Sequence, residues 1–381
     1  MLPIHGGFAI IPRHPGYGNE KAWAMKRKKR LIVLPNWVGD AIMATPLLRE
    51  VSYHWKESDI IYAGNPITAN IFRESPRCDG IMELPKKVSP SFFSGLKGVL
   101  ENQKLYFGQN FDSALILRSS FSSALSTFLA KIPERMGYAR EGRSFFLSKS
   151  LPHPKTFRKS HRVYYYLNLL ELLDHSYAER APRDSTLEIF LDEASRDWAK
   201  KEIRRLALIR PILAIHLGAA FGPSKRWPKE KFLDSLKFLR SKLPDFSILL
   251  VGSPGEKEEN DAFLEAAKYS EIPGASFVGS TKGIVELAAL LDECDLLLSN
   301  DSGPMHVAAA LQKKQLAIFS STNPDFSRPW SDHASYIAAD LQCSPCFHRN
   351  CSVRRSPPFP CHENISCELV SRTLAELLTS S

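Results

Sequence analysis

Short apolar runs alternate with helix-like segments along most of the chain, and they do so in two separate series. Continuous apolar strands separated by helices are typical of a parallel sheet with both faces covered. The pattern therefore predicts an α/β fold made of two Rossmann-like units. The strand-like runs of the first series are 31–35, 59–64 and 113–120, and those of the second are 212–218, 246–253, 295–300 and 316–321.

The length of 381 residues agrees with two domains, because a single hydrophobic core rarely grows to that size. A polar stretch at 178–186 is typical of a linker. Residues 1–25 hold glycines and prolines without periodicity, and we expect them to be disordered or to result from a misassigned start. The predicted divisions after that extension are an N-terminal domain at 26–180, a C-terminal domain at 186–340, and a cysteine-rich segment with a last helix at 341–381.

Charge and hydropathy narrow the classes of partner. No apolar run is long enough for a membrane-spanning helix or a signal peptide, so we expect a cytoplasmic protein. The net charge is +9, and nine Lys or Arg stand against two acids between Lys131 and Arg162. Such an excess indicates either a basic face that is simply solvated or an anionic partner, such as a membrane surface or a phosphorylated substrate. No nucleic-acid-binding signature accompanies it, so no nucleic acid partner is expected.

One stretch of the second series, SNDSGPMHVAAALQ at 299–312, joins the end of a strand to the start of a helix. Ser302 stands where an N-cap is expected, and Gly303 lets a ligand approach the backbone. The free N–H groups and the positive dipole end of such a helix suit a phosphate, with His306 one turn further on the same face. Asp301 could bind sugar hydroxyls. The alternative is a well-capped core helix with a satisfied histidine.

Two further residues follow predicted strands. The turn GAAFGPSKRWP presents Lys225 just before a helix, where a lysine can neutralise a diphosphate as a point charge. Asp40 follows the run 31–35 in the stretch NWVGD. An acid in that position either caps the helix or lies at the carboxyl edge of the sheet, where open α/β folds bind ligands. Dehydrogenase, NTPase and hydrolase signatures are missing from the sequence.

These stretches, in this order, resemble glycosyltransferase family 9, the ADP-heptose:lipopolysaccharide heptosyltransferases. The resemblance covers residues 26–340 and is carried by PNWVGDAIMATPLLRE, ILRSSFSSALSTFLAKIPERMGY, HLGAAFGPSKRWP and SNDSGPMHVAAALQ with IFSSTNPDFSRPW. Within the family, NWVGD and GAAFGPSKRWP are more similar to the heptosyltransferase II type than to the heptosyltransferase I type.

The resemblance implies a GT-B fold, with two parallel sheets facing a central cleft. It implies inverting transfer of heptose from ADP-heptose to the inner-core heptose of lipopolysaccharide (heptosyl-Kdo2-lipid A), with no cofactor or metal required. Asp40 would be the catalytic base. The donor-binding residues it implies are Lys225, Asp301, Ser302, Gly303, His306 and a ribose-binding glutamate after the strand 246–253. Either Glu256 or Glu258 matches that glutamate, and Glu258 is preferred.

The same resemblance gives the basic stretch a role, because the acceptor carries carboxylates and phosphates and lies in a membrane. We expect the enzyme to be peripheral to the inner face of the cytoplasmic membrane, with the membrane surface as a partner. The residues expected to steer the acceptor are Arg118, Arg135, Arg140 and Arg143.

Cysteines gather near the C-terminus with the spacing C-x2-C-x4-C-x9-C. The opening C-x2-C is a common start of a zinc site, but the later spacings match no standard zinc module. Reduced structural thiols are therefore favoured over a structural zinc site at Cys343, Cys346, Cys351 and Cys361.

Two other functions remain open from the sequence. One is a related heptosyltransferase with a different acceptor, either another core position or a protein. The other is a non-catalytic nucleotide-sugar-binding protein, and the presence of both Asp40 and Lys225 argues against it.

Overall fold

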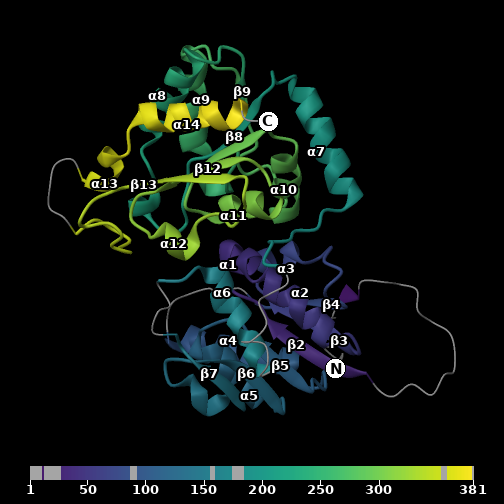
Figure 1. Ribbon diagram of the computed structural model, residues 1–381. Coiled ribbons are helices and arrows are strands. Elements are labelled where there is room, and N and C mark those ends of the chain that lie inside the picture. Colours follow the sequence, from purple (N-terminus) through teal and green to yellow (C-terminus); the bar gives the residue numbers. More distant parts are fainter. Residues whose placement is uncertain are drawn as a thin grey trace. The chain divides into compact units, whose positions relative to one another are not determined.

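The structure is a computed structural model that describes residues 11–12, 27–85, 92–154, 159–173, 184–352 and 358–379. The chain divides into two compact units (Figure 1), of which unit 1 comprises residues 1–157 and 163–185, and unit 2 comprises 158–162 and 186–381. The predicted linker at 178–186 lies mostly outside the described residues.

Unit 1 is built around one sheet, whose strand order in the described part is β1-β4-β3-β2-β5-β6-β7. All pairs are parallel except β1 with β4. The strands are β1 (Ile11–Pro12), β2 (Lys28–Val33), β3 (Ser58–Gly64), β4 (Gly80–Glu83), β5 (Ser113–Ile116), β6 (Glu134–Ala139) and β7 (Lys149–Pro152). The helices are α1 (Val38–Met43), α2 (Thr45–His54), α3 (Pro66–Ile71), α4 (Phe92–Tyr106), α5 (Phe121–Leu129), η1 (Arg143–Phe146), α6 (Arg162–Leu167) and η2 (Asn168–Leu172).

Unit 2 repeats this plan with a six-stranded parallel sheet in the order β10-β9-β8-β11-β12-β13 among the residues described. Its strands are β8 (Ile212–His216), β9 (Ser247–Leu250), β10 (Gly274–Ser276), β11 (Leu296–Asn300), β12 (Gln315–Phe319) and β13 (Ala334–Ala338). Its helices are α7 (Glu193–Leu206), η4 (Pro223–Lys225), α8 (Lys229–Arg240), η5 (Pro254–Glu256), α9 (Lys257–Tyr269), α10 (Ile284–Asp292), α11 (Gly303–Ala310), α12 (Pro324–Ser327), α13 (Pro360–Asn364) and α14 (Cys367–Thr379).

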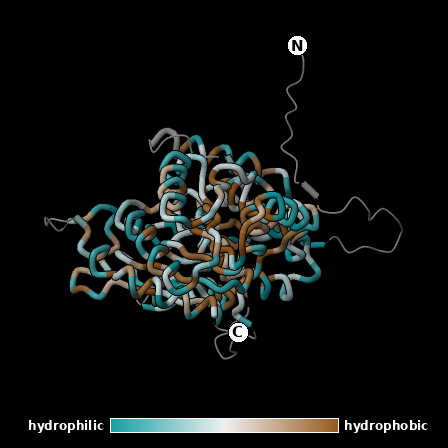
Figure 2. The backbone as a smooth tube through the Cα atoms, turned by 90° about the horizontal axis from the view of Figure 1, so that it is seen from above, coloured by the Kyte–Doolittle hydropathy of each residue, from teal (hydrophilic) through white to brown (hydrophobic). Residues whose placement is uncertain are grey.

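The predicted α/β class is confirmed, and the strands form for the reason the sequence suggests. The central strands β8, β9, β11 and β12 are buried at every position, and they are apolar except at or next to their ends. In Figure 2 the brown, hydrophobic segments lie mostly inside the trace and the teal ones mostly outside. Pro46 lies in the first turn of α2, where its missing N–H needs no partner, so it does not interrupt the predicted helix.

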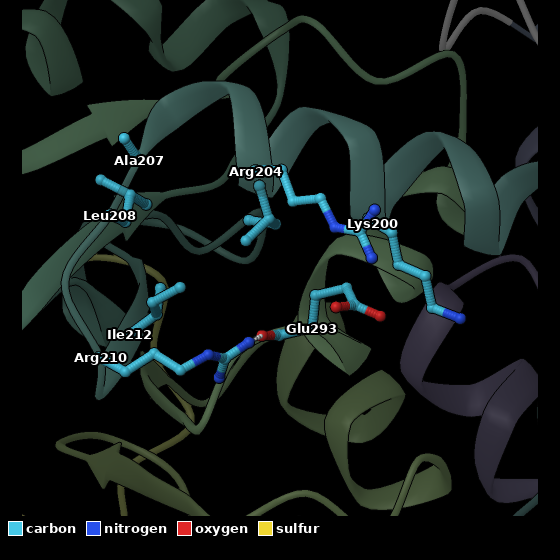
Figure 3. Close-up of a pocket in the computed structure, with 8 residues that line it drawn as sticks. Lys200, Arg204, Ala207, Leu208, Arg210, Ile212 and Glu293 are labelled. Carbon is cyan, nitrogen blue, oxygen red and sulfur yellow. Dashed lines mark hydrogen bonds between the residues drawn. The ribbon is translucent and has the colours of Figure 1, made fainter.

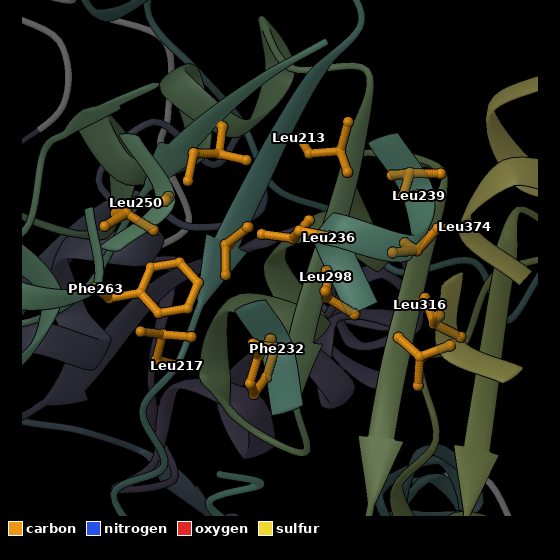
Figure 4. Close-up of a cluster of buried hydrophobic side chains, with 14 of the residues drawn as sticks. Leu213, Leu217, Phe232, Leu236, Leu239, Leu250, Phe263, Leu298, Leu316 and Leu374 are labelled. Atoms are coloured by element: carbon orange, nitrogen blue, oxygen red, sulfur yellow. The ribbon is translucent and has the colours of Figure 1, made fainter. Parts of the chain in front are cut away.

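The core of unit 2 lies between its sheet and the helices α8, α9 and α14. Leucines of β8 and β11 pack there against Phe232 and Leu236 of α8 and Leu374 of α14 (Figure 4). The C-terminal helix therefore completes the core of this unit. None of the helices in the described part of the chain has the length and hydrophobicity needed to cross a bilayer.

Of the extension at 1–25, only residues 11–12 are described, and they form the edge strand β1. That strand was not expected from the sequence. The remainder of the predicted disordered stretch lies outside the described residues.

Candidate functional site

The sheet of unit 2 reverses its strand order between β8 and β11, because β9 and β10 follow on one side and β12 and β13 on the other. In open α/β sheets, ligands bind at the carboxyl ends of the two strands that flank such a reversal. Here those ends lead into the turn 217–225 after β8 and the turn 301–303 after β11. The predicted donor-binding residues of these two turns therefore lie at the expected edge of the sheet.

Lys225 and Asp301 are brought together at this edge. The Nζ of Lys225 lies 2.5 Å from Oδ2 of Asp301, and their side chains are 15% and 4% exposed. Thr322, after β12, donates its hydroxyl to the same Oδ2 at 2.6 Å. Phe221 lies under the ammonium, with 5.1 Å from Nζ to the ring centroid. A buried, paired cation at the carboxyl edge is a preorganised counter-charge for an anionic ligand.

The turn that carries Lys225 is held on both sides. Asn300, the last residue of β11, donates to the carbonyl of Leu217 at 2.7 Å and accepts from the backbone N–H of Trp227 at 3.1 Å. Ser224 donates to the carbonyl of His348 at 2.5 Å. Gly222 is in close contact with Arg349, so that an added Cβ would lie 2.6 Å from its Cγ. The cysteine-rich segment thus positions the lysine turn, which the sequence did not indicate.

Helix α11 begins where predicted, with Ser302 in the N-cap position. Its hydroxyl makes no capping hydrogen bond, and the Oγ is buried without a partner among the described residues. The predicted cap is therefore a backbone feature only, and the first turn of α11 keeps N–H groups available for an anion. His306 is 4% exposed and lies one turn into this helix.

A second buried histidine, His161, was not singled out from the sequence. Its ring packs on Trp330 with centroids 4.4 Å apart, and its Nε2 donates to the carbonyl of Arg328 at 2.9 Å. Burial, together with the nearby His306 and Arg328, lowers the pKa of His161 to about 4, although the hydrogen bond to the carbonyl of Arg328 acts in the opposite direction. His161 is therefore neutral at neutral pH.

The two candidate glutamates lie in different surroundings. Glu256 is half-buried, and its Oε2 accepts hydrogen bonds from the N–H and the hydroxyl of Ser253, both at 2.7 Å. Its carboxylate fills the space beside Gly218, where an added Cβ would lie 1.6 Å from Oε1. Glu258 is exposed in the first turn of α9. The geometry therefore favours Glu256 over Glu258 as the residue at the carboxyl edge.

The charge state of Glu256 fits a hydrogen-bond acceptor. Burial raises the pKa of its carboxyl, but the nearby His216 and the hydrogen bonds from Ser253 together bring it below its ordinary value. An ionised carboxylate accepts hydrogen bonds at both oxygens, as binding of a ribose diol requires.

In unit 1 the strand order reverses between β2 and β5. Asp40 lies in the first turn of α1, just beyond the carboxyl end of β2. The N-cap position of that helix belongs to Trp37, which is 61% exposed and makes no side-chain cap. Asp40 is therefore not the N-cap that the simplest interpretation of the sequence would make it. Arg118 reaches the same edge from β5, and its Nε donates to the carbonyl of Leu34 at 2.9 Å.

The four arginines expected to steer an acceptor divide into two kinds. Arg143 is buried, at 1% exposure, and its guanidinium donates to the backbone carbonyls of Tyr138 and Arg118. Arg135 likewise donates to the carbonyls of residues 132, 133 and 146. These contacts are structural. Arg118 keeps one buried guanidinium nitrogen without a partner among the described residues, and Arg140 is half-exposed beside Glu141, 3.0 Å away.

One cavity of unit 2 lies away from this edge. It measures about 360 Å³ and is lined by α7 and by residues that precede β8 and β11, including Lys200, Arg204, Arg210 and Glu293 (Figure 3). These residues mark the amino ends of the strands, opposite the edge that carries Lys225. The cavity is therefore separate from the candidate site.

No disulfide forms between the cysteines of the described residues. Burial and the three neighbouring thiols raise the pKa of Cys361 to about 11. Within the described ranges, no three His, Cys, Asp or Glu side chains lie close enough together to hold a metal ion. The zinc site at Cys343, Cys346, Cys351 and Cys361 stays a prediction that metal analysis of the purified protein tests.

The arrangement at the carboxyl edge of unit 2 pairs a buried lysine with an open helix start, and comparison with known proteins gives it a context. The model of glycosyltransferase family 9 (heptosyltransferase) matches residues 103–356. The chain belongs to glycosyltransferase family 9. The predicted family is thus confirmed, and the chain is a glycosyltransferase.

Relatives and solved structures agree with this assignment. Lipooligosaccharide heptosyltransferase 2 of Campylobacter jejuni is 28% identical over 358 residues, which cover 93% of this chain and 99% of the relative. Lipopolysaccharide heptosyltransferase 2 of Salmonella typhimurium is 25% identical over 316 residues, which cover 81% and 87%. The structure of the ADP-heptose lipopolysaccharide heptosyltransferase II of E. coli matches with a TM-score of 0.72 and 23% identity over 92% of this chain and 98% of that one. The family 9 structure from Veillonella parvula matches with a TM-score of 0.76 and 21% identity over 93% and 98%.

Proposed function

We propose that this glycosyltransferase moves L-glycero-D-manno-heptose from ADP-heptose to the inner-core heptose of lipopolysaccharide. The observation that carries the proposal is the Lys225–Asp301 pair beside the open start of α11. A lysine and free N–H groups at one sheet edge suit a diphosphate, and a carboxylate beside them suits sugar hydroxyls. Two curated relatives that cover most of the chain are named heptosyltransferase 2, which supports heptose as the sugar.

The donor would lie along the carboxyl edge of unit 2. Glu256, an ionised acceptor between the ends of β8 and β9, would take the ribose hydroxyls. The first N–H groups of α11 and the Ser302 hydroxyl would bind phosphate oxygens, because these donors lack partners of their own. Lys225 would then divide its contacts between Asp301 and the diphosphate, and Asp301 would accept from the sugar.

The chemical step is a single displacement with inversion. Asp40 takes the proton of the acceptor hydroxyl while that oxygen attacks the anomeric carbon. The bond from this carbon to the β-phosphate oxygen breaks, and ADP leaves with the electron pair. Lys225 and α11 balance the charge that develops on the leaving diphosphate. The transition state has oxocarbenium character, which the carboxylate of Asp40 also favours.

Acceptor binding would fall to unit 1. Arg118 lies at the same sheet edge as Asp40, with a guanidinium nitrogen still available, so it suits a carboxylate or phosphate of the acceptor. Arg140 is the second candidate, because it is half-exposed. We infer that the acceptor, a glycolipid, brings the enzyme to the inner face of the cytoplasmic membrane.

The test is ADP release from ADP-heptose with three acceptors: heptosyl-Kdo2-lipid A, Kdo2-lipid A, and none. The proposal expects rapid release only with heptosyl-Kdo2-lipid A and a product one heptose heavier, with the anomeric configuration opposite to that of the donor. Release with Kdo2-lipid A alone would instead identify a first-heptose transferase. Retained configuration would contradict the single displacement.

A further inference from the structure

Large hydrophobic side chains are exposed together on one part of unit 1. They lie on α4, α5 and η1. These three elements are neighbours, because α5 packs against both α4 and η1. Phe145 is the most exposed, at 81%. We call this set the aromatic face, and its members are Leu96, Leu100, Phe121, Phe128, Leu129 and Phe145.

The aromatic face is a built surface rather than a set of loose side chains. Phe146 lies at its centre, and its ring contacts those of Phe121, Phe128 and Phe145 edge-on, with centroids 5.1, 5.3 and 5.5 Å apart. Phe146 also packs against the buried core of unit 1. Apolar patches of this kind on a soluble protein usually mark an interaction site, because they oppose solubility.

Positive charge surrounds the aromatic face. Lys97 and Lys104 are exposed on α4, and Lys131 is exposed two residues after α5. The guanidinium of Arg135 lies over the ring of Phe128, 5.4 Å from its centroid. Between residues 92 and 149, seven Lys or Arg have exposed or half-exposed side chains against four acids. Exposed aromatic rings bordered by lysines complement an anionic lipid surface, where rings enter the interface and lysines contact headgroups.

The aromatic face is also fixed to the sheet edge that carries Asp40. Phe121 begins α5 three residues after Arg118, which donates to the carbonyl of Leu34 at the end of β2. From the other side, the buried guanidinium of Arg143 links η1 to the backbone of Arg118. A membrane bound at the aromatic face would therefore lie next to the edge where a lipid-linked acceptor must be deprotonated.

We propose that the aromatic face docks unit 1 onto the anionic phospholipid surface of a membrane, with Phe145 and Phe121 entering the interface. The occupant is the phospholipid leaflet itself, not the acyl chains of the acceptor. The inference deepens the proposed function, since a lipid-linked acceptor gives the docking its purpose, but the binding it describes needs no acceptor.

The experiment is co-sedimentation of the full chain with vesicles of phosphatidylcholine, with and without phosphatidylglycerol, and without any lipopolysaccharide. We expect binding to the phosphatidylglycerol vesicles that weakens at high salt. F145S or F121S should bind roughly ten-fold more weakly, since each removes a phenyl ring that would enter the interface. The matched control is Y269S, because Tyr269 is 91% exposed in unit 2, and it should bind like the wild type.

Three results would overturn the proposal. They are equal binding to both kinds of vesicle, unchanged binding of F145S and F121S, and a change of oligomeric state in these variants, which would make the face a contact between copies. Activity separates this inference from the proposed function. F145S should keep its turnover on detergent-dispersed acceptor and lose it on vesicle-embedded acceptor, whereas failure of the proposed function would abolish wild-type turnover in both formats and leave vesicle binding intact.

Discussion

Replacement of Lys225 by Met separates the structural role of the lysine from its catalytic one. The variant removes the ammonium that lies 2.5 Å from Asp301 and keeps a side chain of similar length. Asp301 is then a carboxylate that is only 5% exposed and has lost its counter-charge. The perturbation should therefore reduce both the stability of unit 2 and the rate of ADP release.

The loss of stability follows from the burial of the pair. Breaking a buried ion pair from one side destabilises a protein by about 3–5 kcal/mol, because the remaining charge is uncompensated. Thr322 still donates to Asp301, so we expect a loss near the lower limit, about 3 kcal/mol. For a domain of this size, that loss lowers the Tm of unit 2 by roughly 6–12 °C.

The loss of activity has a different cause and can be measured apart. Removing one group that stabilises developing charge typically lowers kcat by about 10²–10³-fold. The assay is ADP release at a temperature well below the variant's Tm. The double variant K225M/D301N should regain most of the Tm, since no buried charge is left unpaired, but none of the turnover. If K225M has the lowered Tm but keeps its kcat within about three-fold of the wild type, the lysine serves only the fold, and its proposed role in ADP release is wrong.

Three further variants test the account. E256Q should raise the Kd for ADP by about ten-fold in calorimetry, as expected for loss of a charged hydrogen-bond acceptor, while E258Q should leave it unchanged. A raised Kd in E258Q and an unchanged one in E256Q would identify Glu258 as the ribose ligand. The pKa of His161 is about 4 in the folded chain against 6.5 in the unfolded chain, so the unfolded state binds the proton first as pH falls. The free energy of unfolding should therefore drop by about 3 kcal/mol between pH 6.5 and 4. Denaturant titrations of H161Q should show a smaller drop over the same pH range, and an equal drop would show that another group is responsible. R143M should lose about 2–4 kcal/mol in free energy of unfolding, because two buried carbonyls lose a charged donor. R140M should lose under about 0.5 kcal/mol and raise the KM for acceptor. Equal stabilities of the two variants would contradict the structural role of Arg143.

The parts of the fold that the sequence predicted are those governed by local pattern. The central strands are fully buried and mostly apolar, so their apolar runs and flanking helices identify them without knowledge of their neighbours. The edge strands escaped prediction. β7 is exposed at most positions and β10 has only three residues, so neither carries a hydrophobic signal. Such strands form because a neighbouring strand offers hydrogen bonds, which is a non-local cause.

The candidate site divides in the same way. Lys225 and Asp301 could be proposed from the sequence because each lies in the segment that connects a strand to the next helix, and carboxyl ends of neighbouring parallel strands share one edge. The choice between Glu256 and Glu258 depends on geometry that the sequence does not show. Gly218 and Gly252 lie just beyond the ends of β8 and β9 and have no side chain, and the carboxylate of Glu256 occupies that space. The burial of Arg143 likewise depends on carbonyls far away in the sequence, so its charge alone suggested a surface residue.

The most direct measurement of the central claim is the turnover of D40N with ADP-heptose and heptosyl-Kdo2-lipid A, set beside its Kd for ADP-heptose. Asparagine keeps the shape of the side chain and cannot accept the proton. The account predicts that kcat falls by about 10²–10⁴-fold while the Kd stays within about two-fold of the wild type. Wild-type turnover in D40N would show that another group removes the proton, and the assignment of Asp40 as the base would be wrong.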